Sequence, residues 1–193
     1  MTELAINDAS MVGRPKYERV ANDAYFTPAW CTEALLSRWS PVGTVWEPAA
    51  GNGAMVDVLD KAGYDVIASD IIEHVDLRVD MVIHQRDFLS AHQPSGVFSI
   101  VTNPPYELAE EFIRRSLALT KPVGGSVAML LRHEYDCASS RRDLFECNGF
   151  SRKIVLTKRP RWFADTTTSP RHNFAWFCWD ARHRGPAILE YAP

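Results

Sequence analysis

A mainly apolar run, Val97–Thr102, that stops at two consecutive prolines most restricts how this chain can fold. The run predicts a buried strand, and the prolines end it because neither can donate a backbone hydrogen bond. Asn103 precedes a proline and is therefore pushed toward an extended conformation. The strand thus ends in a stiff turn that presents an amide, carbonyl groups and the ring of Tyr106. Open α/β sheets bind ligands at such carboxyl ends of strands.

The rest of the chain alternates between strand and helix patterns, which is typical of an α/β protein with a parallel sheet. We expect a single Rossmann-like domain with a mostly parallel, seven-stranded sheet, helices on both faces and a C-terminal antiparallel hairpin. Thr27 is expected to cap the first helix. The domain is predicted to span residues 23–193, after a flexible arm at 1–22. Strands are expected at 44–48, 64–69, 82–86, 97–102, 125–131, 153–158 and 174–179, and helices at 29–39, 54–61, 107–119 and 139–147.

The composition is that of an ordinary globular protein, with 46% hydrophobic and 23% charged residues in 193. No apolar run is long enough to span a membrane and no signal-peptide pattern is present, so a cytoplasmic protein is expected. The cysteines show no metal-ligand spacing, and we interpret them as reduced thiols. They are Cys31, Cys137, Cys147 and Cys178.

Charge is distributed unevenly along the chain, whose net charge is -3. Residues 132–184 hold 11 Lys and Arg against 6 Asp and Glu, whereas the remainder holds 10 against 18. A basic C-terminal third could meet nucleic-acid phosphates while the rest stays acidic, although ordinary surface variation would produce the same pattern.

The turn at 103–106 suits chemistry on a planar amine. The side-chain oxygen of Asn103 and the carbonyl of Pro104 could each accept one N–H bond from such an amine. They would hold the nitrogen and direct its lone pair at an electrophile, while Tyr106 stacks on the attached ring. A plain Pro-Pro turn that caps the following helix is the alternative.

Polar side chains follow four predicted strands, and the carboxyl ends of parallel strands line one crevice. Gly51 and Gly53 would let a ligand approach the backbone, although a lone GxG is a weak signal. Asp70 follows the next strand and could accept both hydroxyls of a ribose. Asp87 with Phe88 could bind and cover an adenine, and Glu47 could neutralise an ammonium group. Ribose, adenine and an amino acid together describe S-adenosylmethionine.

In this order, the motifs resemble those of class I methyltransferases, and most of all the amino-methylating DNA adenine methyltransferases of bacteria and phages. The resemblance covers roughly residues 23–131 and implies an S-adenosylmethionine-dependent enzyme acting on the exocyclic amine of adenine in DNA. It places amine binding and catalysis on Asn103, Pro104, Pro105 and Tyr106. It implies cofactor contacts at Tyr25, Phe26, Thr27, Glu47, Gly51, Gly53, Asp70, Asp87 and Phe88. Neither a metal nor a covalent intermediate is expected.

One departure concerns DNA recognition, because the chain has no stretch long enough for a separate target-recognition domain. The loop at 159–173 alone combines basic and aromatic residues, which suit phosphate contact and base stacking. We therefore expect DNA contacts there and relaxed or short-site specificity, with a hairpin tip packed on the sheet edge as the alternative. The predicted contacts are Arg159, Arg161, Trp162 and Arg171.

Two other functions remain open from the sequence. Methyltransferases of RNA bases or of protein glutamine use a similar turn, although the glutamine enzymes usually carry an additional N-terminal helical domain. A nucleic-acid-binding protein with a degenerate methyltransferase core would require broken motifs, and these are intact. Target sequence, strand state and oligomeric state are not determined by the sequence.

Overall fold

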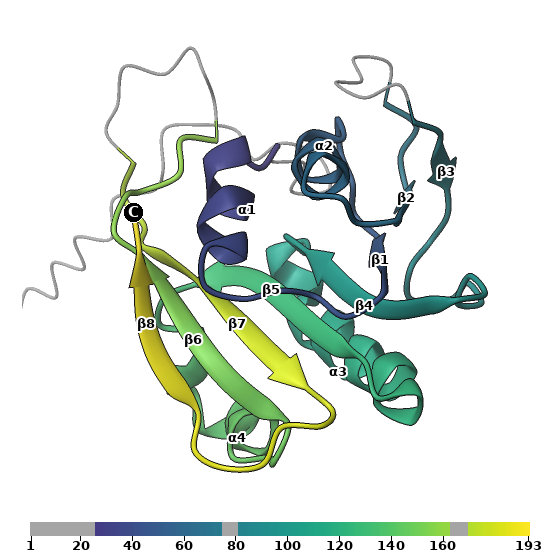
Figure 1. The fold of residues 1–193 in the computed structure, drawn as a ribbon. Coiled ribbons are helices and arrows are strands. Elements are labelled where there is room, and N and C mark those ends of the chain that lie inside the picture. Colours follow the sequence, from purple (N-terminus) through teal and green to yellow (C-terminus); the bar gives the residue numbers. More distant parts are fainter. Residues whose placement is uncertain (1–25, 75–80, 163–169) are drawn as a thin grey trace, which may run out of the picture.

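Eight strands form one sheet in the computed structural model, which describes residues 26–74, 81–162 and 170–193 (Figure 1). The sequence predicted the first seven, and the eighth is an addition. They are β1 (Thr44–Glu47), β2 (Val66–Asp70), β3 (Ile83–Gln85), β4 (Val97–Thr102), β5 (Ser126–Arg132), β6 (Phe150–Leu156), β7 (Phe174–Asp180) and β8 (Ile188–Ala192).

The strand order is β3-β2-β1-β4-β5-β7-β6-β8. The first five strands run parallel, and β7 is antiparallel to both β5 and β6, which confirms the predicted C-terminal hairpin. The order reverses direction between β1 and β4, so a crevice is expected beyond the carboxyl ends of these two strands. Glu47 ends β1, and Asn103 follows β4.

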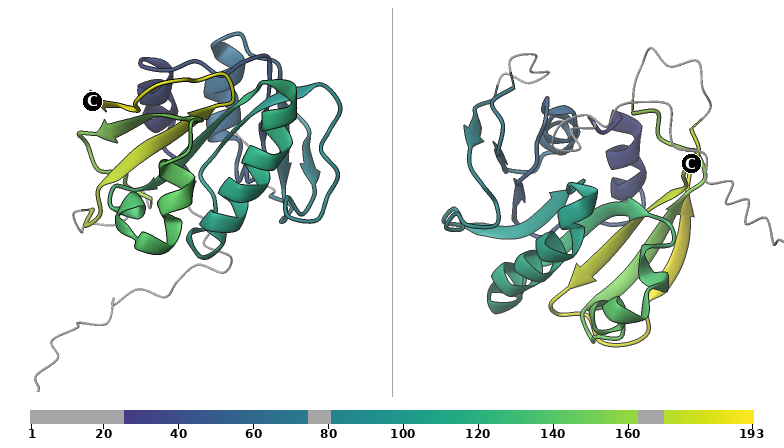
Figure 2. Two further views of the ribbon diagram at one scale, coloured as in Figure 1. Left: turned by 90° about the horizontal axis from the view of Figure 1, so that it is seen from below. Right: turned by 180° about the vertical axis from the view of Figure 1, so that it is seen from behind.

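Within the described ranges, four α-helices cover the two faces of the sheet. They are α1 (Ala29–Leu36), α2 (Ala54–Lys61), α3 (Ala109–Thr120) and α4 (Arg142–Phe145). One core cluster joins α1 and α2 to the sheet through Cys31, Leu35, Met55 and Leu59. A second cluster joins α3 and α4 to the opposite face through Phe112, Ile113 and Leu144. Figure 2 shows α3 and α4 on the side away from α1.

Three local expectations change in the structure. The extra strand β8 pairs parallel with β6 at the sheet edge, where its mostly exposed residues and flanking prolines gave only a weak strand signal. The helix expected at 139–147 is a 3-10 turn followed by the four-residue α4. Thr27 does not cap α1, because Pro28 occupies the N-cap position and no side chain caps the helix.

The polar ends of the strands gather at one edge of the sheet. The β6–β7 loop reaches the same edge, because Arg132 at the end of β5 pairs with Phe174 at the start of β7. Across 26–74, 81–162 and 170–193, no helix has the length and apolar character needed to cross a membrane. The same described ranges contain no group of three His, Cys, Asp or Glu side chains placed to hold a metal ion.

Candidate active site

The turn after β4 presents a hydrogen-bond acceptor that no other described group uses. Nδ2 of Asn103 donates to the hydroxyl of Thr27 at 3.1 Å. The other end of the amide, Oδ1, is buried and has no hydrogen-bond partner among the described residues. A buried acceptor without a donor costs free energy, on the order of 1–3 kcal/mol. Such an atom is therefore well placed to bind a donor brought by a ligand.

The two prolines leave a second acceptor beside it. The carbonyl of Pro105 accepts the N–H of Leu108 at 3.0 Å and so begins a short 3-10 turn, Tyr106–Leu108. No donor among the described residues reaches the carbonyl of Pro104. Asn103 Oδ1 and the Pro104 carbonyl are thus two acceptors in consecutive residues, the pair to which the sequence analysis assigns a target amine. Two acceptors suit a group with two N–H donors, such as an amine on a ring.

Tyr106 belongs to a row of aromatic rings that runs from the turn to the hairpin. Its ring centroid lies 6.0 Å from that of Phe174, which lies 5.0 Å from that of Trp162. The guanidinium of Arg132, at the end of β5, lies 5.9 Å from the Tyr106 ring centroid. The sequence did not single out Arg132, since nothing local marks the last residue of a strand as a neighbour of the turn. The row places Trp162 beside the turn, on a part of the hairpin predicted to bind DNA.

Glu47 lies between the ends of β2 and β4 and is almost completely buried. Its Oε1 accepts hydrogen bonds from the hydroxyl of Thr102 at 2.6 Å and from the N–H of Ala49 at 3.1 Å. Its Oε2 has no partner among the described residues. Burial raises the pKa of Glu47 to about 8, and the nearby charge of Asp70 adds to this effect. A cation that reached Oε2 would favour the ionised form and would find a ready partner.

The loop after β1 brings backbone N–H groups and the carboxylate of Asp70 together. Gly51 and Gly53 have φ values of 54° and 82°, which residues with a side chain rarely adopt. The N–H of Gly51 donates to Oδ2 of Asp70 at 2.8 Å, and the N–H of Ile72 donates to Oδ1 at 2.9 Å. A carboxylate has about four acceptor sites, so each oxygen retains capacity for another donor. Asp70 can therefore still accept two hydroxyl groups.

Three side chains surround this loop. The ring of Phe26 lies so close to Gly51 that a Cβ there would be 3.0 Å from it. The rings of Phe26 and His74 meet edge to face at 5.6 Å, and Nε2 of His74 lies 3.6 Å from Oδ2 of Asp70. Ile71 is 55% exposed directly after Asp70. Sequence reasoning missed His74 and Ile71, although an apolar residue next to a strand-end acid was a usable signal. Tyr25 lies outside the described residues.

Asp87 and Phe88 follow β3 but are placed differently from each other. Asp87 is exposed, and its carboxylate accepts hydrogen bonds from the N–H of Leu89 and the hydroxyl of Ser90. Phe88 is 2% exposed and packs in the core between Trp46 and Phe112, with ring-centroid distances of 5.1 Å and 4.7 Å. The structure therefore brings Asp87 to the surface near the site, and it does not expose the Phe88 ring to a ligand.

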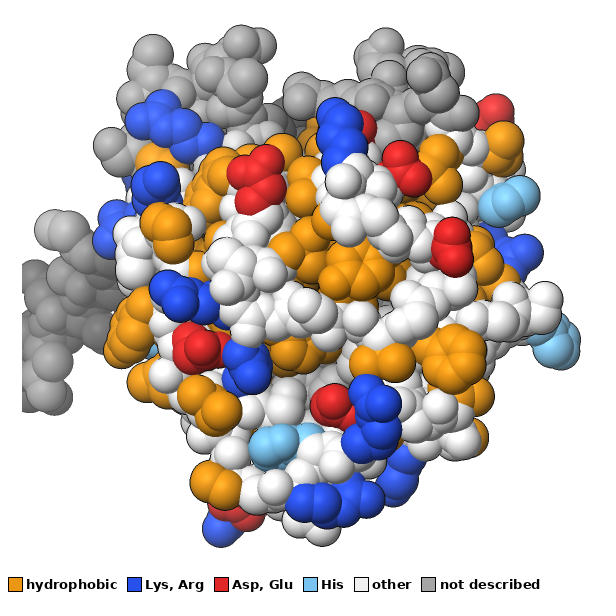
Figure 3. Space-filling model, viewed as in Figure 1, with side chains coloured by type: hydrophobic (Ala, Val, Ile, Leu, Met, Phe, Trp, Pro, Cys, Tyr) orange, Lys and Arg blue, Asp and Glu red, His pale blue; other side chains and the backbone are white. Residues whose placement is uncertain are grey.

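The described ends of the hairpin loop carry the predicted basic residues at the surface. Arg159 crosses the loop, donating to Oδ1 of Asn173 at 2.8 Å and to the carbonyl of Pro170 at 3.2 Å. Arg161 and Arg171 are exposed. On the face seen in Figure 3, Lys and Arg side chains gather at the upper left, above the carboxyl ends of β6 and β8. Arg159 therefore shapes the loop, whereas Arg161 and Arg171 are available to a partner.

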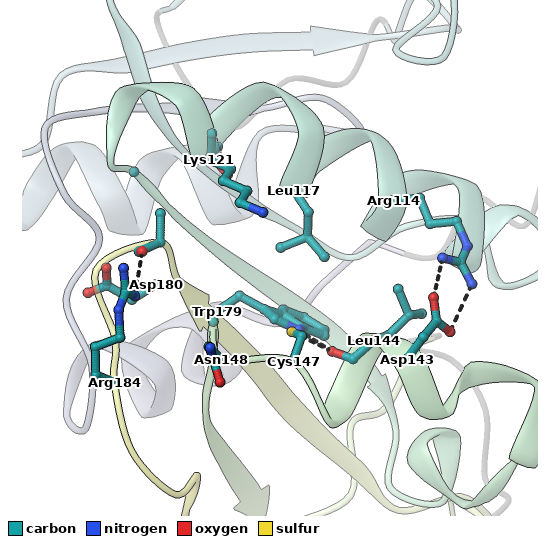
Figure 4. Close-up of a pocket in the computed structure, with 14 residues that line it drawn as sticks. Arg114, Leu117, Lys121, Asp143, Leu144, Cys147, Asn148, Trp179, Asp180 and Arg184 are labelled. Atoms are coloured by element: carbon teal, nitrogen blue, oxygen red, sulfur yellow. Dashed lines mark hydrogen bonds and ion pairs between the residues drawn. The ribbon is translucent and has the colours of Figure 1, made fainter.

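A cavity of about 580 Å³ lies at the opposite edge of the sheet, between α3, α4 and the end of β7 (Figure 4). Several of its polar groups bind one another. Arg114 pairs with Asp143 at 2.7 Å, and the indole N–H of Trp179 donates to the carbonyl of Leu144 at 2.8 Å. We place the site at the carboxyl edge instead, where buried acceptors have no donor among the described residues.

Comparison with known proteins identifies the fold. The sequence matches no protein-family model and no curated protein. A candidate class I S-adenosylmethionine-dependent methyltransferase of Listeria monocytogenes has a similar structure, with a TM-score of 0.61 at 17% identity over 92% of this chain and 68% of that one. The M protein of the type I restriction enzyme EcoKI has a TM-score of 0.53 at 16% identity, over 81% of this chain and 44% of that one.

An enzyme named as acting on RNA is similar to the same degree. The 23S rRNA methyltransferase ErmE has a TM-score of 0.52 at 18% identity, over 86% of this chain and 72% of that one. This chain spans less than half of the EcoKI M protein. The chain therefore has the class I methyltransferase fold, which confirms the Rossmann-like α/β prediction.

Proposed function

We propose that this protein is an S-adenosylmethionine-dependent methyltransferase that acts on the exocyclic amine of adenine in DNA. One observation carries the proposal: Oδ1 of Asn103 is a buried acceptor to which no group in the described part of the chain donates. It lies at the carboxyl end of β4, next to the reversal of strand order where ligands of α/β sheets bind. The class I methyltransferase fold of the chain supports the same reaction class.

The turn would prepare the amine for reaction. Asn103 Oδ1 and the Pro104 carbonyl each accept one N–H, which holds the nitrogen in place and draws its lone pair away from the ring. Tyr106 stacks on the base and keeps the ring in position after it has left the DNA stack. With the cofactor bound, the nitrogen–carbon bond would form as the sulfur–methyl bond breaks and a neutral thioether leaves, and the surplus proton of the nitrogen would pass to solvent. Positioning and electrostatics supply most of the acceleration.

The residues at the ends of β1 and β2 fit S-adenosylmethionine. Asp70 retains acceptor capacity for two ribose hydroxyls, and the open backbone at Gly51 allows close approach. The buried Oε2 of Glu47 lacks a partner and suits the cationic end of an amino acid. The exposed Ile71 is placed to cover an adenine face, a role that the buried Phe88 ring cannot fill. When bound, the cofactor supplies an electrophilic methyl group on a sulfonium.

DNA is the favoured substrate because of the hairpin. Arg161 and Arg171 are exposed on the loop that the aromatic row connects to Tyr106. Arginines there would contact phosphates equally in any sequence, and a short loop supports few contacts to base edges. We therefore propose relaxed or short-site recognition. Sequencing of DNA methylated by the purified protein tests this point, and modification confined to one motif of about six or more defined bases would contradict it.

The decisive experiment is incubation of the purified protein with radiolabelled S-adenosylmethionine and separate pools of DNA, RNA and protein, followed by nucleoside and amino-acid analysis. We expect labelled N6-methyladenine from DNA. Label in RNA would favour the alternative of an RNA methyltransferase, which the likeness to ErmE also supports. Label in glutamine would mean that the same turn binds the side-chain amide of a protein substrate. No label in any pool would refute the proposed activity.

A further inference from the structure

Thr27 and Asn103 are 76 residues apart in the chain and are joined by one partly buried hydrogen bond. Nδ2 of Asn103 donates to Oγ1 of Thr27 at 3.1 Å. Thr27 is 8% exposed, so its side chain is largely shielded from solvent. The same amide presents the buried Oδ1 that has no partner among the described residues. One end of the side chain is thus bound, and the other end is left available.

The orientation of this amide decides what it can bind. An asparagine side chain has an acceptor at one end and a donor at the other, and rotation by about 180° exchanges them. A target amine presents N–H donors to the turn, so only the orientation with Oδ1 toward it makes a hydrogen bond. The opposite orientation would set two donors against each other and leave both unsatisfied.

The local sequence explains why the Thr27 hydroxyl is available. Threonine before a helix usually caps it, but Pro28 occupies the N-cap position of α1, with φ -58° and ψ 137°. Because Thr27 precedes a proline, its backbone is pushed toward an extended conformation. The hydroxyl is therefore left to accept the hydrogen bond from Nδ2 of Asn103.

We infer that Thr27 is a positioning residue, whose hydroxyl anchors one end of the Asn103 amide and keeps the other end within reach of the target amine. This inference rests on the proposed function of the same turn. It gives Thr27 a role in holding Asn103 besides the cofactor contact that the sequence resemblance implies. A hydroxyl can donate as well as accept, so the N–H groups of the target amine select the orientation with Oδ1 toward them, and Thr27 fixes the position of the side chain.

Nuclear magnetic resonance tests the hydrogen bond without any need for activity. The chain has six asparagines, so side-chain amide labelling yields few signals, and the Asn103 signal is identified by its loss in Asn103→Asp. We expect the Asn103 Nδ2 protons to exchange with water about tenfold faster in Thr27→Val than in wild type, the factor that corresponds to one hydrogen bond. Thr27→Ser should restore slow exchange. Equal exchange in wild type and Thr27→Val would overturn the inference.

Kinetics test the consequence for catalysis. Valine in place of Thr27 leaves the Asn103 side chain without its anchor, whereas serine keeps a hydroxyl there. We expect Thr27→Val to lower kcat about tenfold and Thr27→Ser to restore it. If Thr27 only contacts the cofactor, Thr27→Val will raise the KM for S-adenosylmethionine and leave kcat unchanged, and the inference fails.

Two controls separate this effect from loss of folding. Thr120 is also buried, and its hydroxyl donates to the carbonyl of Ser116 at the far edge of the sheet, so Thr120→Val should leave kcat unchanged. Thr27→Ala removes the same hydroxyl with less bulk if valine lowers the Tm. A wild-type protein that labels no substrate pool would refute the proposed function alone, because the exchange measurement still decides whether Thr27 anchors Asn103.

Discussion

The hydroxyl of Thr102 donates a 2.6 Å hydrogen bond to Oε1 of Glu47 and thereby ties the end of β4 to the end of β1. Thr102 directly precedes Asn103, and Glu47 begins the loop that leads to Gly51. The proposed amine site and the proposed cofactor site therefore share one buried contact. A shift of either strand end would therefore disturb the other. Because Glu47 makes this contact, it is the most informative residue for experiment.

Glu47 should make the stability of the free protein depend on pH. Burial raises its pKa to about 8 from an ordinary value of 4.5. Between these values the folded state keeps a proton that the unfolded state has lost, so stability falls as pH rises through this window. Glu47→Gln keeps an acceptor for Thr102 and cannot ionise. We expect it to be more stable than wild type at about pH 8, by on the order of a few kcal/mol, in urea unfolding. A wild-type pH dependence in the variant would contradict this.

Cofactor binding should release a proton from the same side chain. At about pH 7 the free protein holds Glu47 mainly protonated, and a cation beside Oε2 would lower its pKa. Calorimetric titration with S-adenosylmethionine in buffers of different ionisation enthalpy should report release of about one proton. Glu47→Gln should bind more weakly and release none. Binding enthalpies that do not vary with the buffer would rule out this coupling.

Asp70 should contribute directly to cofactor affinity. Its two oxygens already anchor the N–H groups of Gly51 and Ile72 and can still accept ribose hydroxyls. We expect Asp70→Ala to weaken S-adenosylmethionine binding by roughly 1.5–3 kcal/mol, the range for hydrogen bonds to a charged group. Asp57→Ala is the control, because Asp57 lies on α2 and pairs there with Lys61. Unchanged affinity in Asp70→Ala would place the cofactor elsewhere.

Asn103 should affect turnover and leave cofactor affinity largely intact. Its free Oδ1 is assigned to the amine, so Asn103→Ala removes a contact to the reacting nitrogen. We expect kcat to fall by about a hundredfold or more, as when a preorganised polar contact at a reacting atom is lost. Asn148→Ala, at an exposed turn by the opposite edge, is the matched control. A variant with the wild-type rate would exclude the amine-binding role.

Arg161 should set the salt dependence of DNA binding. It is exposed on the hairpin loop, whereas Arg159 is occupied within the loop by Asn173 and Pro170. Arg161→Ala should weaken binding about equally for all DNA sequences and reduce the slope of log K against log salt by about 0.9. Lys121→Ala, exposed at the far edge, should change neither. A loss confined to one DNA sequence would instead assign Arg161 to base recognition.

Most of the fold could be predicted from local patterns. Apolar runs of strand length, prolines after β4 and glycines after β1 act over a few residues, so the sequence shows them directly. The strand-end positions of Glu47, Asp70 and Asn103 follow from these patterns, because parallel strands bring their carboxyl ends to one edge. The sequence patterns did not predict β8, because an exposed edge strand lacks a continuous apolar signal.

The contacts between strand ends were decided by tertiary structure alone. The sequence assigned Phe88 to a ligand, but packing against Trp46 and Phe112 buries its ring. It assigned Thr27 to a helix cap, but the fold brings its hydroxyl to Asn103. Burial and long-range hydrogen bonds depend on what lies across the sheet, and no local pattern encodes that neighbour. The sequence by itself therefore determined which chemical groups stand at the carboxyl edge, and only the folded chain decided which of them remain available to bind.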